Sequence, residues 1–343
     1  MALLEIKDLH TFFRTKKGIV KAVNGVSYSV DEGKTLGVVG ESGSGKSVSA
    51  MSVLQLLDGN GYVDSGEILF EGKDLTKCSK NEMYNIRGND ISVIFQEPMT
   101  ALNPVFSVEK QLSEPFIIHR NMNKKDAAAA ALKMLGDVKI PNPEVVAKQY
   151  PHQLSGGMRQ RVMIAIALAC EPRLLIADEP TTALDVTIQA QILYLMNELK
   201  KEFGTAILFI THDLGVINQM ADDVAVMYCG QVVEHVPNRE LFSYDRVFSH
   251  PYTEGLMASI PRLDTDTSSR LDAIPGAVPH PLSLPKGCKF GPRCKFCTKK
   301  CMEEEPELVK VAEGHEVRCF YPELAKRTAE IKKDKKEEKR HGK

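Results

Sequence analysis

Residues 40–47 have the sequence Gly-Glu-Ser-Gly-Ser-Gly-Lys-Ser, whose spacing is typical of a loop that binds phosphates. The glycines let backbone N–H groups turn inward around phosphate oxygens, Lys46 reaches the outer phosphates, and the Ser47 hydroxyl is a ligand for Mg²⁺. Such a loop needs a strand before it and a helix after it. Residues 36–39 predict the strand and residues 48–57 the helix. The nucleotide contacts predicted for this stretch are Gly40, Ser42, Gly43, Ser44, Gly45, Lys46, Ser47 and Val48.

Two adjacent carboxylates, Asp178 and Glu179, follow the apolar residues 174–177. A buried strand that ends in two acids points them toward the edge where phosphates bind. Asp178 is expected to hold Mg²⁺ through water, and Glu179 to polarise the attacking water as a general base. The loop and the carboxylates together predict a site that hydrolyses a nucleotide.

Ser155, Gly156 and Gly157 form a second candidate anion site, because they precede a helix that is expected to start near Met158. Backbone donors at a helix N-terminus attract negative charge. The chain already has one phosphate cradle, so a second one implies another use.

The segment at 154–157 resembles the signature of ABC-type ATPases, which caps the γ-phosphate of a nucleotide bound to the opposite subunit. The resemblance spans about residues 3–260. It implies that Gln96 is the Q-loop glutamine, which senses Mg²⁺ and the transmembrane partner, and that Asp185 belongs to the D-loop at 183–185. It also implies that His212 is the switch histidine that contacts the γ-phosphate.

The same resemblance completes a predicted catalytic set of Lys46, Glu179 and His212, with Ser47, Gln96 and Asp178 around Mg²⁺. In this family an aromatic residue upstream of the loop stacks on adenine, and Phe13 is our assignment. Phe12 is the alternative, and either ring could instead belong to the core.

Strands that alternate with helices predict an α/β fold whose mostly parallel sheet is covered on both faces. The resemblance implies a RecA-like P-loop NTPase core with antiparallel β and α-helical subdomains. We expect an ATPase domain at 1–260, with its helical subdomain at about 97–160. A small metal-binding cysteine module at 261–325 and a charged flexible tail at 326–343 are expected to follow.

Five of the eight cysteines crowd into residues 288–319, which suggests a metal site in a reducing compartment. This ending and the segments 96–104 and 150–155 resemble the oligopeptide/dipeptide importer branch of ABC ATPases. The resemblance implies a [4Fe-4S] cluster on Cys288, Cys294, Cys301 and Cys319. Four thiolates also suit tetrahedral Zn²⁺, Cys297 could exchange with Cys301, and free thiols are a further alternative.

A net charge of −1 gives no reason to expect a nucleic-acid partner, and the longest apolar run, 162–170, is too short to span a membrane. We therefore expect a peripheral protein at the cytoplasmic face of the membrane. The branch implies ATP-driven uptake of di- or oligopeptides, with a homologous ATPase or a second copy, two permeases and an extracytoplasmic solute-binding protein. The alternatives are an importer of nickel or another solute, a soluble ABC ATPase without a transporter, and a metal-dependent protein that only binds nucleotide.

Overall fold

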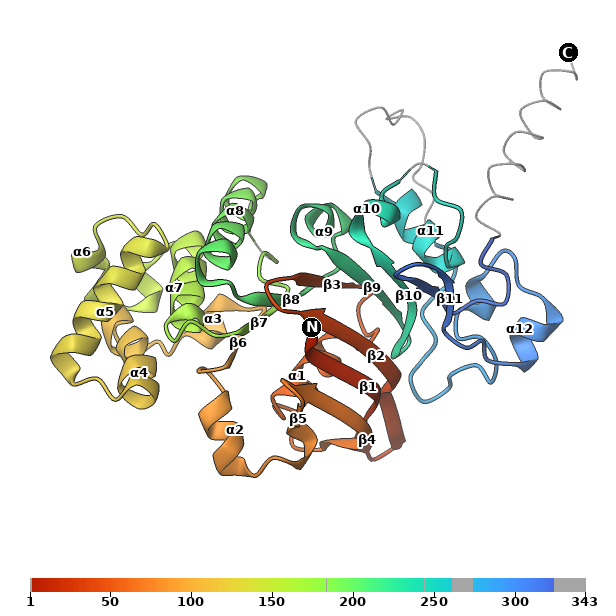
Figure 1. Ribbon diagram of the computed structural model, residues 1–343, viewed down its shortest axis with the longest axis horizontal. Helices are drawn as coiled ribbons and strands as arrows, with labels where there is room; N and C mark the ends of the chain where they lie inside the picture. Colours follow the sequence, from red (N-terminus) through yellow and green to blue (C-terminus); the bar gives the residue numbers. More distant parts are fainter. Residues whose placement is uncertain (1, 183, 244, 261–273, 324–343) are drawn as a thin grey trace, which may run out of the picture.

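Two β-sheets form the centre of the computed structural model, which describes residues 2–182, 184–243, 245–260 and 274–323 (Figure 1). The smaller sheet is antiparallel and has the order β2-β1-β4-β5. Its strands are β1 (Ala2–Thr15), β2 (Gly18–Asp31), β4 (Gly61–Phe70) and β5 (Lys73–Asp74). The predictions for Ala183, for residues 261–273 and for the tail at 326–343 lie outside the described residues.

The larger sheet has the order β11-β12-β10-β9-β3-β8-β7-β6, and its neighbours from β9 to β6 run parallel. Every residue of β3, β7 and β8 is buried, as expected for parallel strands covered on both faces. The predicted strands before the glycine-rich loop and before the two carboxylates are therefore confirmed. The eight strands are β3 (Thr35–Val39), β6 (Ile91–Ile94), β7 (Leu174–Asp178), β8 (Ala206–Thr211), β9 (Asp223–Tyr228), β10 (Gln231–Pro237), β11 (Val309–Ala312) and β12 (His315–Val317).

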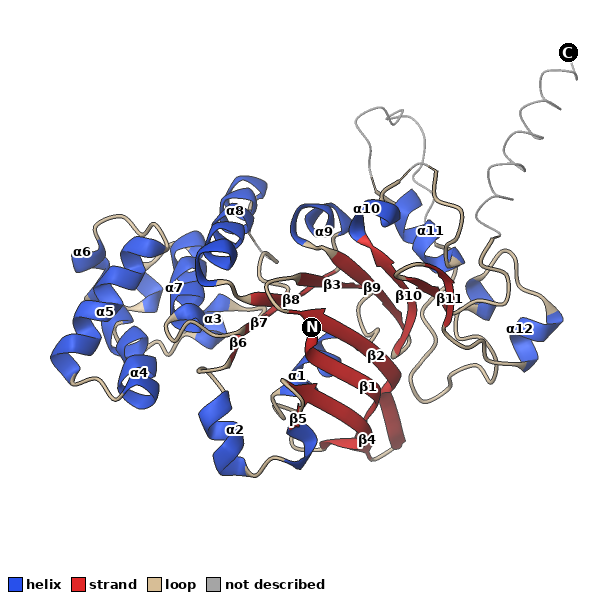
Figure 2. Ribbon diagram, viewed as in Figure 1, coloured by secondary structure: helices blue, strands red, loops and turns tan. Residues whose placement is uncertain are grey.

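Helices gather at one end of the molecule, where Figure 2 shows no strand. The alanine-rich stretch predicted to be helical is α5, with the predicted bounds Lys124–Asp137. Its buried Ala127 and Ala131 pack into the larger of the two cores. The neighbouring helices are α3 (Pro98–Ala101), α4 (Val108–Arg120), α6 (Pro143–Ala147) and α7 (Gly156–Leu168). No helix in the described ranges is long and apolar enough to cross a membrane.

Helix α1 (Lys46–Val53) is shorter than the helix predicted for residues 48–57. It ends because Gln55 takes a left-handed φ of 51°. The Arg87 side chain donates hydrogen bonds to the carbonyl oxygens of Leu54 and Gln55, at 2.8 and 3.3 Å. A cation on the last carbonyls is a common way to end a helix.

The remaining helices connect the sheets or cover their faces. They are α2 (Lys80–Ile86), α8 (Val186–Phe203), α9 (Leu214–Met220), α10 (Asn238–Leu241), α11 (Pro251–Ala258) and α12 (Lys299–Glu303). Short 3₁₀ turns occupy Leu75–Lys77, Pro151–Gln153 and Gly291–Arg293.

The C-terminal region extends the sheet of the core. Strand β12 pairs with β10, with Val317 opposite Glu234 and Glu316 opposite His235. Figure 1 shows this region and the helices α4–α6 at opposite ends of the long axis. The domain boundary placed at residue 260 stays a prediction, and the region beyond it shares the larger sheet with residues before it.

A buried network of charged side chains holds strand β12 against the core. The ring of His315 lies between two carboxylates, with Nε2 3.0 Å from Glu234 Oε1 and Nδ1 2.8 Å from Glu240 Oε1. Glu234 also accepts hydrogen bonds from the backbone of His250 (2.7 Å) and the hydroxyl of Ser249 (3.3 Å). Burial opposes the charge on His315, but its bonds to the two carboxylates outweigh burial and raise its pKa. An imidazolium with both N–H groups satisfied therefore joins β12 to β10 and α10.

Substitution of this histidine tests the network. We expect His315→Ala to lower the free energy of unfolding by about 3 kcal/mol, because it leaves a buried carboxylate without its partner. A raised pKa stabilises the fold fully below the unfolded histidine value, and this contribution is lost as pH rises through the folded value. Urea denaturation should thus show a larger difference between variant and wild type at about pH 6 than at about pH 9. The exposed Glu313→Ala is the control, and an equal loss at both pH values would contradict the charged network.

Candidate nucleotide site

The glycine-rich loop lies between the end of β3 and the start of α1, packed against neighbouring backbone. Gly40 has φ +154°, and a Cβ there would lie 2.2 Å from the carbonyl oxygen of Met227. Gly45 has φ +95°, and its Cβ would lie 2.4 Å from the carbonyl oxygen of Ala22. Neither position has room for a side chain, and glycine adopts a positive φ without strain. The two glycines therefore allow the tight loop that the phosphate-binding motif requires.

Polar groups inside the loop have the chemistry of an anion cradle. The buried Lys46 ammonium donates hydrogen bonds to the carbonyl oxygens of Gly40 and Glu41, at 2.8 and 3.1 Å. The Ser44 hydroxyl is buried and has no hydrogen-bond partner among the described residues. Buried polar groups are normally satisfied, so this hydroxyl is free to bond to a ligand oxygen.

The residues predicted to hold Mg²⁺ supply suitable oxygen donors. The Ser47 hydroxyl donates to Asp178 Oδ1 at 2.8 Å, which places a hydroxyl and a carboxylate side by side. Burial raises the pKa of Asp178, while the Ser47 bond and the Lys46 charge oppose that rise. Hard cations such as Mg²⁺ prefer this donor set, so these residues fit the ion. Gln96, the third predicted Mg²⁺ ligand, instead donates a hydrogen bond to Glu179.

The carboxylate of Glu179 contacts two other predicted site residues, Gln96 and His212. Its Oε2 accepts hydrogen bonds from Gln96 Nε2 (3.1 Å) and Thr182 Oγ1 (3.0 Å). The Nδ1 atom of His212 lies 3.3 Å from the other carboxylate oxygen. Gln96, Glu179 and His212 follow the adjacent strands β6, β7 and β8, whose carboxyl ends share one edge. Thr182 was missed, because no pattern in the sequence set it apart.

A cavity of about 490 Å³ adjoins the loop. Phe13 lines it together with Ser42, Gly43, Gly45 and Val48 of the predicted set. Phe12 is buried instead, with its ring edge-on to Tyr62 at 6.3 Å between centroids. The structure therefore places Phe13, and not Phe12, beside the loop. Further lining residues come from the C-terminal region and could not be found from the sequence; they are Val278, Pro279, His280, Pro281 and Leu284.

The signature segment lies apart from the cavity. Ser155 caps α7 by accepting a hydrogen bond from the Met158 N–H at 3.3 Å, and Asp185 caps α8 in the same way. A Cβ at Gly157 would lie 2.9 Å from Ile188, so the signature packs on the start of α8. Among the described residues, none that lines the cavity comes from the signature or from Leu184 and Asp185 of the D-loop.

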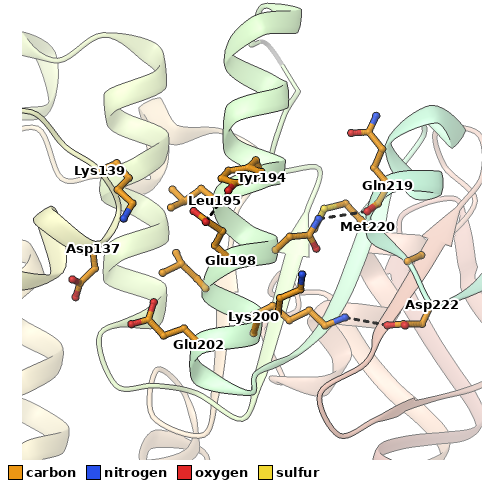
Figure 3. Close-up of a pocket in the computed structure, with 14 residues that line it drawn as sticks. Asp137, Lys139, Tyr194, Leu195, Glu198, Lys200, Glu202, Gln219, Met220 and Asp222 are labelled. Atoms are coloured by element: carbon orange, nitrogen blue, oxygen red, sulfur yellow. Dashed lines mark hydrogen bonds and ion pairs between the residues drawn. The ribbon is translucent and has the colours of Figure 1, made fainter.

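A larger open groove of about 860 Å³ lies between the end of α5 and helices α8 and α9 (Figure 3). Its charges are mixed, and Lys200 pairs with Asp222 at 3.0 Å across it. It contains none of the predicted site residues, so size alone does not identify the nucleotide site.

The cysteine-rich region does not show the expected metal centre. Within the described ranges, no three or more His, Cys, Asp or Glu side chains are arranged to hold a metal ion. Burial, with smaller contributions from neighbouring thiols, raises the pKa of Cys294 to about 11 and of Cys319 to about 12. The thiols instead bond locally, as where Thr298 Oγ1 lies 3.3 Å from Cys301 Sγ. The predicted [4Fe-4S] or zinc site is thus not supported by this geometry.

Replacing each phenylalanine by leucine tests the assignment of the adenine contact. We expect Phe13→Leu to weaken ATP binding about tenfold, because aromatic stacking on a base is worth about 1–3 kcal/mol. Binding of inorganic tripolyphosphate, which has no base, should not change. Phe12→Leu is the matched control, measured by competition with a fluorescent nucleotide. A loss confined to Phe12→Leu would reverse the assignment.

Two known families match this chain. Residues 23–182 match the family described as ABC transporter, and residues 233–301 match the C-terminal region of oligopeptide/dipeptide transporters. Oligopeptide transport ATP-binding protein AppD of Bacillus subtilis is 52% identical over 93% of this chain and 96% of its own length. The OppD protein of Escherichia coli is 49% identical over 94% of both chains.

Solved structures agree with these matches. The dimeric ATP-binding cassette MJ0796, in a post-hydrolysis state bound to ADP and Pi, superposes with a TM-score of 0.62 and 27% identity. It covers 69% of this chain and 99% of its own. With its fold and loop geometry, the chain belongs to the ABC transporter family, among the ATP-binding subunits of the oligopeptide/dipeptide branch.

Proposed function

We propose that this chain hydrolyses ATP to drive the import of di- or oligopeptides through a membrane transporter. ATP hydrolysis follows from the family, and the oligopeptide named in the relatives' descriptions favours peptides over nickel. A soluble ABC ATPase is not favoured, because the match to the transporter C-terminal region covers residues 233–301. The main structural support for this proposal is that Gln96 and His212 both contact the Glu179 carboxylate.

Each residue has a distinct task in this proposal. The loop N–H groups, Lys46 and the Ser44 hydroxyl bind the phosphates, and Phe13 stacks on the base. Ser47 and Asp178 would hold Mg²⁺, which neutralises phosphate charge when bound. Glu179 accepts a proton from the attacking water, while Gln96 and Thr182 hold its carboxylate in place. His212 is 60% exposed at its side chain, so it is accessible to the terminal phosphate.

A second subunit completes the site in this proposal. Ser155, Gly156 and Gly157 lie at the N-terminus of α7, where free N–H groups favour an anion. They do not line the cavity of their own chain. In this proposal they bind the terminal phosphate of the nucleotide held by a facing subunit, as the family resemblance implies. Asp185 caps the start of α8 and would sense that subunit. Closure of the two subunits then becomes a condition for hydrolysis.

The partners follow from the same assignment. The facing subunit is a homologous ATPase or a second copy of this chain. Two permeases carry the membrane-spanning segments, and an extracytoplasmic protein delivers the peptide. We place the chain on the cytoplasmic face of the membrane, bound to the permeases.

We infer that the cysteine cluster binds a structural [4Fe-4S] centre, with Zn²⁺ as the alternative. The backbone N–H of Cys288 donates a hydrogen bond to the carbonyl oxygen of Cys301 at 2.8 Å, and the other thiols of the predicted set contribute to the raised pKa of Cys319, so these cysteines share one region of the fold even though their side chains are not arranged around a metal ion. Four thiols match the donors of either centre. When bound, the centre would cross-link a region with little apolar core.

Glu179→Gln tests the general base. The amide keeps the size of the carboxylate but accepts no proton, so turnover should fall by about a hundredfold or more while ATP binding is retained. The assembly should then stay closed on ATP, provided that the partner site is disabled as well. Lys46→Ala should instead weaken ATP binding itself.

Steady-state ATPase assays and nucleotide-binding measurements on the assembled transporter separate these effects. Glu198→Gln on the exposed face of α8 is the control. Near-normal turnover in the doubly disabled assembly would remove Glu179 from the role of base.

Anaerobic purification tests the cluster. We expect about four iron and four sulfide per chain, with broad absorbance near about 400 nm. Cys301→Ser should lose the iron, whereas Cys78→Ser, outside the cluster, should keep it. A colourless protein with one zinc, or one without metal, would contradict the iron–sulfur assignment.

A further inference from the structure

Arg293, in the cysteine-rich region at 288–319, forms hydrogen bonds to the glycine-rich loop at 40–47. Arg293 donates two hydrogen bonds to the carboxylate of Glu41, at 2.6 and 3.1 Å. Glu41 is the second residue of the glycine-rich loop, 252 positions away in the sequence. Arg293 is only 7% exposed, and its Nε donates to the Pro275 carbonyl oxygen at 2.9 Å. The guanidinium is therefore fixed on both sides, and its forked geometry matches the carboxylate.

The backbone of Glu41 is held as well. Its N–H donates to the hydroxyl of Tyr252 at 2.8 Å. The ring of Tyr252 packs on Tyr228 and Phe290, with centroids 4.7 and 5.5 Å away. Tyr252 belongs to α11, Tyr228 to β9 and Phe290 to the cysteine-rich region. The three rings pack together next to Glu41 of the loop. Both ends of the Glu41 residue are thus anchored outside the loop.

The position of Glu41 affects the phosphate-binding groups directly. Lys46 Nζ donates to the Glu41 carbonyl oxygen at 3.1 Å, so a shift of Glu41 displaces the lysine. The C-terminal region that contains Arg293 also lines the same cavity as Phe13, through Pro279 and His280. This region therefore contacts the nucleotide site at its loop and at its cavity.

We propose that Arg293 is a positioning residue for the phosphate loop, and that the cysteine-rich region sets ATP affinity through the Arg293–Glu41 pair. The inference rests on the nucleotide site proposed above. Arg293 does not touch the reacting atoms. It holds the loop in the conformation that receives the phosphates, so its loss raises the KM for ATP more than it lowers kcat.

Variants of the pair test this proposal. We expect Arg293→Gln and Glu41→Gln each to raise the KM for ATP about tenfold, because each removes the charged two-point contact that holds the loop. The double variant should be no worse than either single one, because both remove the same contact. Arg293→Lys keeps the charge without the fork and should recover only part of the affinity.

Lys289→Gln is the matched control. Lys289 is a buried cation of the same region, and its ammonium bonds to the carbonyl oxygens of Pro285 and Gly287 and to the Glu305 carboxylate, outside the loop. It should lower thermal stability as much as Arg293→Gln does, yet leave the KM for ATP unchanged. Binding of a fluorescent ATP analogue to the full chain gives the affinity without the partner ATPase.

The outcomes separate three cases. A raised KM for the Arg293 and Glu41 variants alone, with non-additive effects, supports the proposal. Equal effects of Lys289→Gln, or additive effects of the pair, would reduce Arg293 to a structural role and overturn it. If the wild-type chain bound no ATP analogue, the nucleotide site itself would fail, and the positioning role with it.

Discussion

The Glu179 carboxylate is the constraint on which the site depends. It can meet Gln96 and His212 only because β6, β7 and β8 are neighbours that run in the same direction. Strand β3 lies next to β8, which brings the phosphate loop to the same edge. Groups far apart in the sequence are thus brought together by the order of four neighbouring parallel strands. Any change in that order would separate the proposed base from the phosphates.

Several residues of this site have backbone conformations or buried charges that are unfavourable for local stability. Glu179 itself has a left-handed φ of 47°, which is unfavourable for a residue with a side chain. Lys46 and Asp178 are buried, and burial lowers the pKa of the first and raises that of the second. Their mutual attraction and the Ser47 bond offset part of this penalty. Bound nucleotide and Mg²⁺ would satisfy the rest, which is why the site is better suited to a ligand than to an empty state.

The sequence predicted what short patterns encode. The loop at 40–47, the acids after β7 and the alanine-rich α5 are local signals, and the structure has them at or near the predicted positions. Long-range contacts had no such signal. The pairing of β12 with β10, the Arg293–Glu41 contact and the cavity wall at 278–284 join segments whose composition says nothing about their partners. The cysteine spacing suggested a metal centre, but spacing alone does not fix the geometry of the thiols.

The central claim is that a nucleotide bound by one subunit is covered by the signature of the facing one. Electron cryo-microscopy of the assembled transporter, held in its ATP-bound state, tests this most directly. We expect the Ser155 hydroxyl to contact the terminal phosphate of the ATP that the facing ATPase binds. If Ser155 instead faces solvent while ATP fills both loops, the proposed coupling of hydrolysis to closure is wrong.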